Sequence, residues 1–249
     1  MSEVRQKSVL VFSGLDPSGG AGMAADLLAI AAQGVHALPV VTALTVQDHN
    51  RVREVVPVDP GLLERQAQVL VAATDIDAVK IGIPGSLANA QVIAQLIRQL
   101  RETRPQLPVV LDPVLASGHG DPLTQGDARA ALVPLLALAT VAVPNLGEAA
   151  ALDLRTCRHV LVTGGHGEGP DVVNRWSSAG QHWEWTWPRL AGEFHGSGCT
   201  LAAAIAARLA LGEQVGQALD TAQTYVQQTL AQAFSIGPGQ RIPRRILTP

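Results

Sequence analysis

The sequence has few aromatic residues, few cysteines and no excess of positive charge. Aromatic residues make up 3% of the 249 residues, so alanine, leucine and valine must fill most of the core. Two cysteines are too few for a disulfide framework, which favours a reducing cytoplasm. The formal net charge is −3, and we expect no binding to nucleic acid or to an anionic membrane.

Long apolar runs and regular histidine spacings are also missing. No uncharged apolar run reaches about 20 residues without a glycine or proline break, so no membrane span is expected. The first seven residues lack the apolar core of a signal peptide. The seven histidines are scattered without metal-ligand spacing, so no zinc site is expected. The densest basic run, residues 241–245, is interpreted as a solvated tail.

Short apolar runs alternate with helical patterns along the chain. Continuous rather than alternating apolar runs predict a parallel sheet that is covered on both faces, and therefore an α/β fold in a single domain over residues 1–249. Strands are predicted at residues 9–12, 39–44, 78–81, 108–112, 141–143 and 160–162. Helices are predicted at residues 23–32, 61–73, 87–101, 127–138, 146–154, 198–211 and 218–234. Trp183, Trp185 and Trp187 alternate with polar residues, which indicates one more strand.

Polar or glycine-rich segments follow several of the predicted strands. They lie at residues 14–22, 45–48, 112–120 and 144–148. Ligands of parallel α/β sheets collect beyond the carboxyl ends of the strands, so we expect these segments to converge on one site. The glycines at 14–22 do not have the G-x-G-x-x-G spacing, and no acidic residue ends the following strand. This pattern argues against a dinucleotide site.

Residues 195–200, His-Gly-Ser-Gly-Cys-Thr, lead directly into an almost wholly apolar helix pattern. Unpaired N–H groups and the positive end of the helix dipole meet at such a junction, so an anion can bind there and a thiolate is favoured. Cys199 is therefore a candidate nucleophile or base of lowered pKa. The alternative is a Gly-Ser turn followed by a cysteine that only packs.

Four further polar side chains have both a structural and a functional interpretation. Asp112, at the end of a strand, either helps to hold a magnesium ion or caps a turn. Asn145 and Glu148 have capping-box spacing, and local spacing alone favours the cap. Lys80 lies in an apolar strand, so it needs a partner or a task unless it snorkels to the surface. Cys157 has no glycine-rich setting and is interpreted as structural.

Taken together, the segments resemble the hydroxymethylpyrimidine/phosphomethylpyrimidine kinases of the ribokinase-like superfamily. The matching pieces are Gly14-x-Asp16-Pro-Ser-Gly-Gly-Ala-Gly22 with Ala25-Asp26-Leu27, Thr42–Gln47, Lys80-Ile-Gly82, Leu111–Val114 with Gly120–Leu123, Pro144–Ala149, Gly164-Gly-His166 and His195–Thr200. They occur in the family's order and cover roughly residues 8–236. The first and the last are the most specific.

The resemblance implies a ribokinase-like three-layer α/β/α sandwich with a mainly parallel central sheet. It implies ATP-dependent phosphorylation of 4-amino-5-hydroxymethyl-2-methylpyrimidine and then of its monophosphate, in thiamin biosynthesis. ATP and Mg²⁺ are the implied cofactors, and a homodimer is the implied assembly.

Roles for individual residues follow from the same resemblance. The pyrimidine pocket matches Gly14, Asp26, Gln47, Ile83 and Val114. The nucleotide side matches Asn145, Thr163 and Gly165, with Asp112 and Glu148 for the metal. The anion hole matches Gly196, Ser197 and Gly198, and Cys199 stands where many sugar kinases of the superfamily carry an aspartate base. We expect Cys199 to accept the hydroxymethyl proton, with its pKa lowered by the helix start.

The sequence departs from the family pattern at several places, two of which are predicted site residues or adjoin one. Ile83-Pro84 stands where relatives often have methionine and leucine, and Thr163 stands where a lysine is usual. These changes leave two alternatives open beside the pyrimidine kinase. One is a pyridoxal-type kinase, and the other is a catalytically weak paralogue that binds the pyrimidine.

Overall fold

The computed structural model of the protein describes residues 5–247. Its strands are β1 (Ser8–Leu15), β2 (His36–Gln47), β3 (Val52–Pro57), β4 (Ala78–Ile81), β5 (Val109–Leu111), β6 (Val141–Ala142), β7 (His159–Val162), β8 (Asp171–Ser178) and β9 (Gln181–Pro188). Its helices are α1 (Gly22–Ala32), α2 (Pro60–Ala73), α3 (Leu87–Thr103), α4 (Ala128–Leu136), α5 (Leu146–Ala151), α6 (Ser197–Ala210) and α7 (Val215–Ala231).

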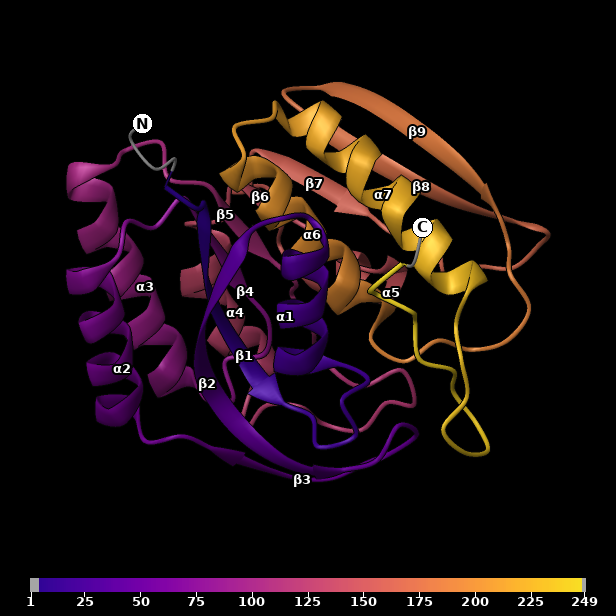
Figure 1. The fold of residues 1–249 in the computed structure, drawn as a ribbon, viewed down its shortest axis with the longest axis horizontal. Helices are drawn as coiled ribbons and strands as arrows, with labels where there is room; N and C mark the ends of the chain where they lie inside the picture. Colours follow the sequence, from indigo (N-terminus) through magenta and orange to yellow (C-terminus); the bar gives the residue numbers. More distant parts are fainter. Residues whose placement is uncertain (1–4, 248–249) are drawn as a thin grey trace.

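The strands form one nine-stranded sheet in the order β3-β2-β1-β4-β5-β6-β7-β8-β9. The strands from β2 to β7 in this order pair in parallel, while β3 is antiparallel at one edge and β8 and β9 are antiparallel at the other. Helices cover both faces (Figure 1), so the predicted three-layer α/β fold with a mainly parallel sheet is confirmed. The single-domain assignment stays a prediction. Within residues 5–247, no helix is long and apolar enough to cross a membrane.

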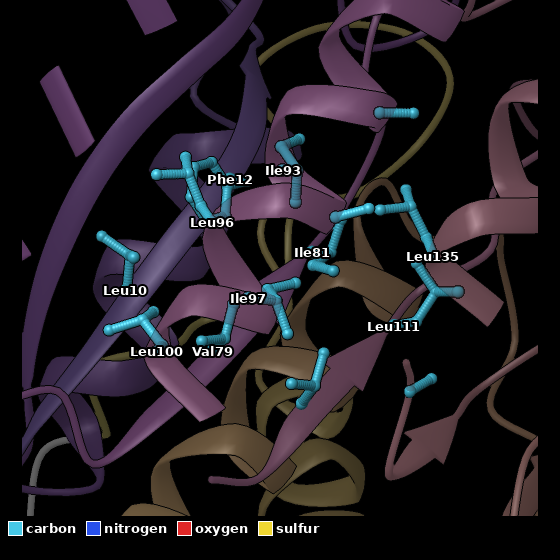
Figure 2. Close-up of a cluster of buried hydrophobic side chains, with 14 of the residues drawn as sticks. Leu10, Phe12, Val79, Ile81, Ile93, Leu96, Ile97, Leu100, Leu111 and Leu135 are labelled. Atoms are coloured by element: carbon cyan, nitrogen blue, oxygen red, sulfur yellow. The ribbon is translucent and has the colours of Figure 1, made fainter. Parts of the chain in front are cut away.

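Strand β1 shows how the sequence builds the two apolar layers. Successive side chains of a strand point to opposite faces of the sheet. Leu10 and Phe12 therefore pack with α2, α3 and α4, whereas Val9 and Val11 pack with α1, α6 and α7, and all four are fully buried. Figure 2 shows the first layer, in which the strand side chains face Ile93 and Ile97 of α3. Two-sided burial explains why this strand reads as a continuous apolar run.

The two antiparallel additions, β3 and β8, are strands that the sequence analysis did not predict. Both lie near the edges of the sheet and have mostly half-buried or exposed side chains, so neither has a continuous apolar run. Strand β9, which carries the three alternating tryptophans, forms as predicted. It is joined to β8 by a two-residue turn at Ala179 and Gly180, which both have positive φ, at 49° and 78°. This backbone is that of a tight hairpin turn, but Ala-Gly is a weaker sequence signal for it than Asn-Gly.

Candidate active site

A cavity of about 1230 Å³ lies at the carboxyl ends of the parallel strands. Parallel strands joined by crossover connections of the same hand have all their following loops at the carboxyl ends of the strands. Segments far apart in the sequence therefore meet there. The predicted site residues that line the cavity are Gly14, Gln47, Ile83, Asp112, Val114, Asn145, Glu148, Thr163, Gly165, Gly196, Ser197, Gly198 and Cys199. A smaller hollow of about 480 Å³, beside Arg5 and Arg104 near the amino ends of the strands, contains none of them.

The glycine-rich loop after β1 is wrapped around the buried carboxylate of Asp16. Ser18 N, Ser18 Oγ and Ala21 N donate hydrogen bonds to it at 2.8–2.9 Å. His195 Nε2 lies 2.7 Å from Asp16 Oδ2, which links this loop to the segment before α6. Burial opposes ionisation of Asp16, but the hydrogen bonds from His195 and Ser18 outweigh it and lower its pKa. Neither Asp16 nor His195 is predicted to have a role from the sequence, although both belong to motifs that carry the family resemblance.

The start of α6 has the geometry that an anion hole needs. Gly196 is the N-cap in the left-handed region, with φ 76°, and no side chain caps the helix. Thr200 N donates to Gly196 O at 3.0 Å, so the N–H groups of residues 197–199 precede the first intrahelical bond. A Cβ built on Gly198 would lie 3.9 Å from Asp112 Oδ2, which places that carboxylate directly beside the helix start.

Two buried acidic residues, Asp112 and Glu148, line the same cavity. Burial raises the pKa of Asp112 to about 6, although the charge of Lys80 opposes the shift. Burial and repulsion by Asp112 raise the pKa of Glu148 to about 7. Glu148 also completes a capping box, because Asn145 N donates to Glu148 Oε2 and Glu148 N donates to Asn145 Oδ1. The cap predicted from spacing is therefore present, and the capping carboxylate also lines the cavity.

Cys199 lines the cavity, but the prediction that the helix start lowers its pKa is wrong. The residue is partly exposed and lines the cavity, while its sulfur is closely surrounded by protein atoms. Burial and repulsion by Asp112 raise the pKa of Cys199 to about 12. Lys80 opposes the shift without reversing it. Cys157 is buried, and its thiol donates to carbonyl oxygens that include that of His159, which fits its structural interpretation.

Asp26 differs from the other predicted substrate-binding residues because it does not line the cavity. Its carboxylate is 2.8 Å from Lys80 Nζ, and both side chains are completely buried. This ion pair gives Lys80 the partner that its position in an apolar strand requires. The structure thus corrects the assignment of Asp26, because its carboxylate neutralises Lys80 beneath the site.

The interpretation of residues 241–245 as a solvated tail is also wrong. Arg244 is exposed, but Arg245 is only 2% exposed. Arg245 Nε donates to Thr200 Oγ1 and its Nη2 donates to Gly20 O, so it contacts both α6 and the glycine-rich loop. The tail follows α7 and turns back toward the start of α6 (Figure 1).

A second group of polar side chains that was not predicted lies at the far wall of the cavity. Gln223 of α7 accepts hydrogen bonds from Asn174 Nδ2 at 2.8 Å and from Trp187 Nε1 at 3.3 Å. Asn174 Oδ1 in turn accepts from Gly164 N at 2.9 Å, which fixes the turn after β7. Asn174 was not predicted as a site residue because its strand, β8, was not predicted. The alternating tryptophans of β9 are the only sequence pattern that indicates this wall of the cavity.

Comparisons with known proteins show the family to which the chain belongs. A model of a family described as phosphomethylpyrimidine kinase matches residues 16–243. The chain is 35% identical to the hydroxymethylpyrimidine/phosphomethylpyrimidine kinase of Streptomyces coelicolor, over 93% of this chain and 91% of that protein. It is 36% identical to the thiamine biosynthesis multifunctional protein ThiED of Corynebacterium efficiens, over 95% of this chain, and spans about a third (34%) of that longer protein.

Solved structures show the same fold. An ADP complex of pyridoxal kinase from Bacillus subtilis superposes with a TM-score of 0.86 at 24% identity, covering 97% of this chain and 98% of that one. Phosphomethylpyrimidine kinase from Clostridium difficile superposes with a TM-score of 0.76 at 26% identity, covering 90% of this chain and 100% of that one.

Proposed function

The chain belongs to the phosphomethylpyrimidine kinase family, and we propose that it phosphorylates 4-amino-5-hydroxymethyl-2-methylpyrimidine and then its monophosphate, with ATP as the phosphoryl donor. One observation carries the proposal. The N-terminus of α6, Cys199, and the acidic residues Asp112 and Glu148 all line one cavity. Phosphoryl transfer depends mainly on in-line positioning and charge stabilisation, which this set of groups provides.

The N–H groups at residues 197–199 would stabilise the negative charge that develops on the transferring phosphoryl oxygens. Asn145, Thr163 and Gly165 lie on the same side of the cavity as Glu148, and we assign them to the nucleotide phosphates. Thr163 offers a neutral hydroxyl for this contact instead of a lysine charge. The α6 dipole and its open N–H groups therefore carry much of the phosphate stabilisation.

Asp112 and Glu148 are the residues that would hold Mg²⁺. Asp112 Oδ2 is buried and has no hydrogen-bond partner among the described residues, so an oxygen is available for a cation. Within the same part of the chain, no three His, Cys, Asp or Glu side chains gather in a metal cluster. Two carboxylates still fit Mg²⁺, which takes its remaining ligands from water and substrate phosphates. The ion supplies positive charge that offsets the negative phosphates.

The pyrimidine side of the cavity is assigned to Gly14, Gln47, Ile83 and Val114. A Cβ on Gly14 would lie 2.5 Å from Ile83 Cδ1, so these two residues form one continuous wall. Gln47 ends β2 at the cavity, where its amide can pair with a ring nitrogen and an exocyclic amine. This pairing is the contact that would separate an aminopyrimidine from pyridoxal.

A coupled assay of ADP release with three acceptors tests the function. We expect turnover with the pyrimidine alcohol and with its monophosphate, at a kcat/KM at least about tenfold above that for pyridoxal. A preference for pyridoxal would overturn the proposal in favour of the related pyridoxal kinases, whose fold this chain shares. Tight binding of the pyrimidine without any turnover would instead identify a binding protein.

We predict that replacement of Cys199 by Ala harms the first phosphorylation more than the second. The alcohol must lose a proton during transfer, whereas a phosphate monoester is already ionised near neutral pH. Single-turnover measurements with each acceptor should show a loss about tenfold larger for the alcohol. A thiol with a pKa of about 12 is neutral in the free protein, so Cys199 can accept the proton only after it has lost its own. Equal losses in both steps would limit Cys199 to a packing or positioning role.

We further propose that the chain forms a homodimer through one face of its sheet, across β1, β2 and β3. Leu15, Leu44, Val46 and Val56 are exposed on adjacent strands, and Leu44 is paired in register with both Leu15 and Val56. An exposed apolar patch of this kind is typical of an interface between chains. The reducing cytoplasm favoured by the two free cysteines stays a prediction.

Replacement of Leu44 by Asp is expected to raise the dimer dissociation constant at least about tenfold, because it places a charge at the centre of the patch. Light scattering over a range of concentrations measures this change. Val69→Asp on α2 is the matched control, since Val69 is 70% exposed and lies outside the patch. A wild-type protein that remains monomeric at every concentration would contradict the assembly.

A further inference from the structure

The C-terminal tail is attached to the active site by main-chain hydrogen bonds. Arg244 N donates to Thr229 O of α7, and the Tyr225 hydroxyl donates to Arg245 O at 2.8 Å. On its other side, His195 N donates to Arg241 O at 2.9 Å, directly before the start of α6. The main chain of residues 241–245 is therefore held both by α7 and by the segment before α6.

The guanidinium of Arg245 joins two loops that are distant in sequence. Its Nη2 donates to Gly20 O at 2.5 Å and lies 3.4 Å from Gly196 O, while its Nε donates to Thr200 Oγ1 at 2.9 Å. Thr200 Oγ1 in turn donates to Gly196 O. The planar fork thus fixes the spacing between the glycine-rich loop and the first turn of α6, which a single ammonium group cannot do equally well.

The packing around Gly196 leaves no room for a side chain. A Cβ there would lie 2.2 Å from Gly20 O and 2.8 Å from Arg245 Nη2. The anion hole, the glycine-rich loop and the guanidinium are consequently in direct contact. Any shift of the guanidinium is transmitted to the N–H groups at residues 197–199.

Arg245 also brings a buried positive charge behind these N–H groups. Its side chain is packed beneath the cavity, and Arg245 is absent from the cavity lining. The acidic groups that it faces include the Cys199 thiol, Asp26 and Asp16. Its Nη1 is buried and has no hydrogen-bond partner within residues 5–247. Such a charge stabilises additional negative charge at the start of α6.

We propose that Arg245 is a positioning residue for phosphoryl transfer, which holds the glycine-rich loop and the start of α6 in one geometry and supports the anion hole with its charge. It acts through Gly196 and the N–H groups of α6. The inference rests on the proposed role of residues 196–199 as the anion hole.

Kinetics of Arg245→Met and Arg245→Lys, with Arg244→Met as the control, test this role. Arg244 is adjacent and exposed and stacks over Phe234, so its loss removes a charge without touching the site. Each kcat is divided by the number of ADP-binding sites found by calorimetric titration, so that unfolded protein does not count. We expect Arg245→Met to lower kcat for the pyrimidine alcohol at least about tenfold.

A purely structural residue would reduce the number of ADP sites and leave kcat per site intact. We expect the opposite for Arg245→Met, with ADP affinity within about threefold of wild type, because ADP lacks the phosphoryl group that the anion hole receives. Arg245→Lys keeps the charge but loses the fork, and its kcat should lie between those of Arg245→Met and wild type. Arg244→Met should stay within about twofold of wild type.

Several results would overturn the proposal. One is a kcat per site within about twofold of wild type for Arg245→Met. Another is a kcat that falls as much in Arg244→Met as it does in Arg245→Met. If Arg245→Met binds no ADP, Arg245→Lys decides the matter, and a wild-type kcat in that variant would exclude the bridging role. If neither variant binds ADP, Arg245 is structural only. Failure of the proposed function is recognised separately, since wild type itself would then show no turnover.

Discussion

Replacing Lys80 by Met is expected to lower the free energy of unfolding by about 3–5 kcal/mol, which is typical for removing one partner of a buried ion pair. Lys80 and Asp26 are 2.8 Å apart and neither side chain is exposed to solvent. The substitution leaves the Asp26 carboxylate buried without its counter-charge, and water cannot reach it. Urea unfolding followed by tryptophan fluorescence measures the loss.

Two further variants show that the loss comes from the buried pair. Lys7→Met removes a lysine that pairs with Asp77 but is 44% exposed, so it should cost less than about 1 kcal/mol. The double variant Lys80→Met with Asp26→Leu should recover most of the stability, because an apolar pair can replace a buried ion pair. If Lys80→Met is as stable as Lys7→Met, then Asp26 becomes protonated in the variant, and its burial as the neutral acid costs little free energy of unfolding.

The sheet could be predicted from the sequence because its central strands are buried on both faces. Val9, Val11, Leu10 and Phe12 leave no polar position, and a run of this kind is the strongest local sign of a parallel strand. Strands β3 and β8 lack that sign, because their position near the edges leaves many side chains half exposed. Their formation depends on partners that are already in place, which local periodicity does not reveal.

The part of the site that could be predicted from the sequence is the part whose position follows from the order and direction of the strands. Loops that follow parallel strands meet at one edge, which accounts for nine of the thirteen predicted residues that line the cavity, at or just beyond the ends of β1, β2, β4, β5, β6 and β7. Residues 196–199 follow the antiparallel strand β9, so this rule does not place them. Contacts between segments distant in sequence were not predictable. Arg245 meets Gly20 across 225 positions, and the Asp26 carboxylate lies beneath the cavity floor instead of on it. The pKa of Cys199 likewise depends on neighbours such as Asp112, and their repulsion and the burial exceed the effect of the helix start.

Replacing Gly196 by Ala is expected to lower kcat by about 100-fold, because a displacement of about 1 Å in positioned groups costs this much. With φ at 76°, the residue occupies a region that disfavours a Cβ, and that Cβ would lie 2.2 Å from Gly20 O. A backbone carbonyl cannot rotate away as a flexible side chain can. Either the glycine-rich loop or the start of α6 must move. The N–H groups at residues 197–199 then no longer point at the transferring phosphoryl group.

Gly212→Ala separates this effect from backbone strain alone. Gly212 lies just beyond the other end of α6 with φ 90°, and a Cβ there would meet nothing within 4 Å. Its substitution should cost about 1 kcal/mol of stability and leave kcat within about twofold of wild type. Single-turnover transfer to the pyrimidine alcohol, together with thermal unfolding, measures both variants. If Gly196→Ala transfers phosphate as fast as Gly212→Ala, the α6 N–H groups do not stabilise the transferring group, and the catalytic assignment of residues 196–198 must be abandoned.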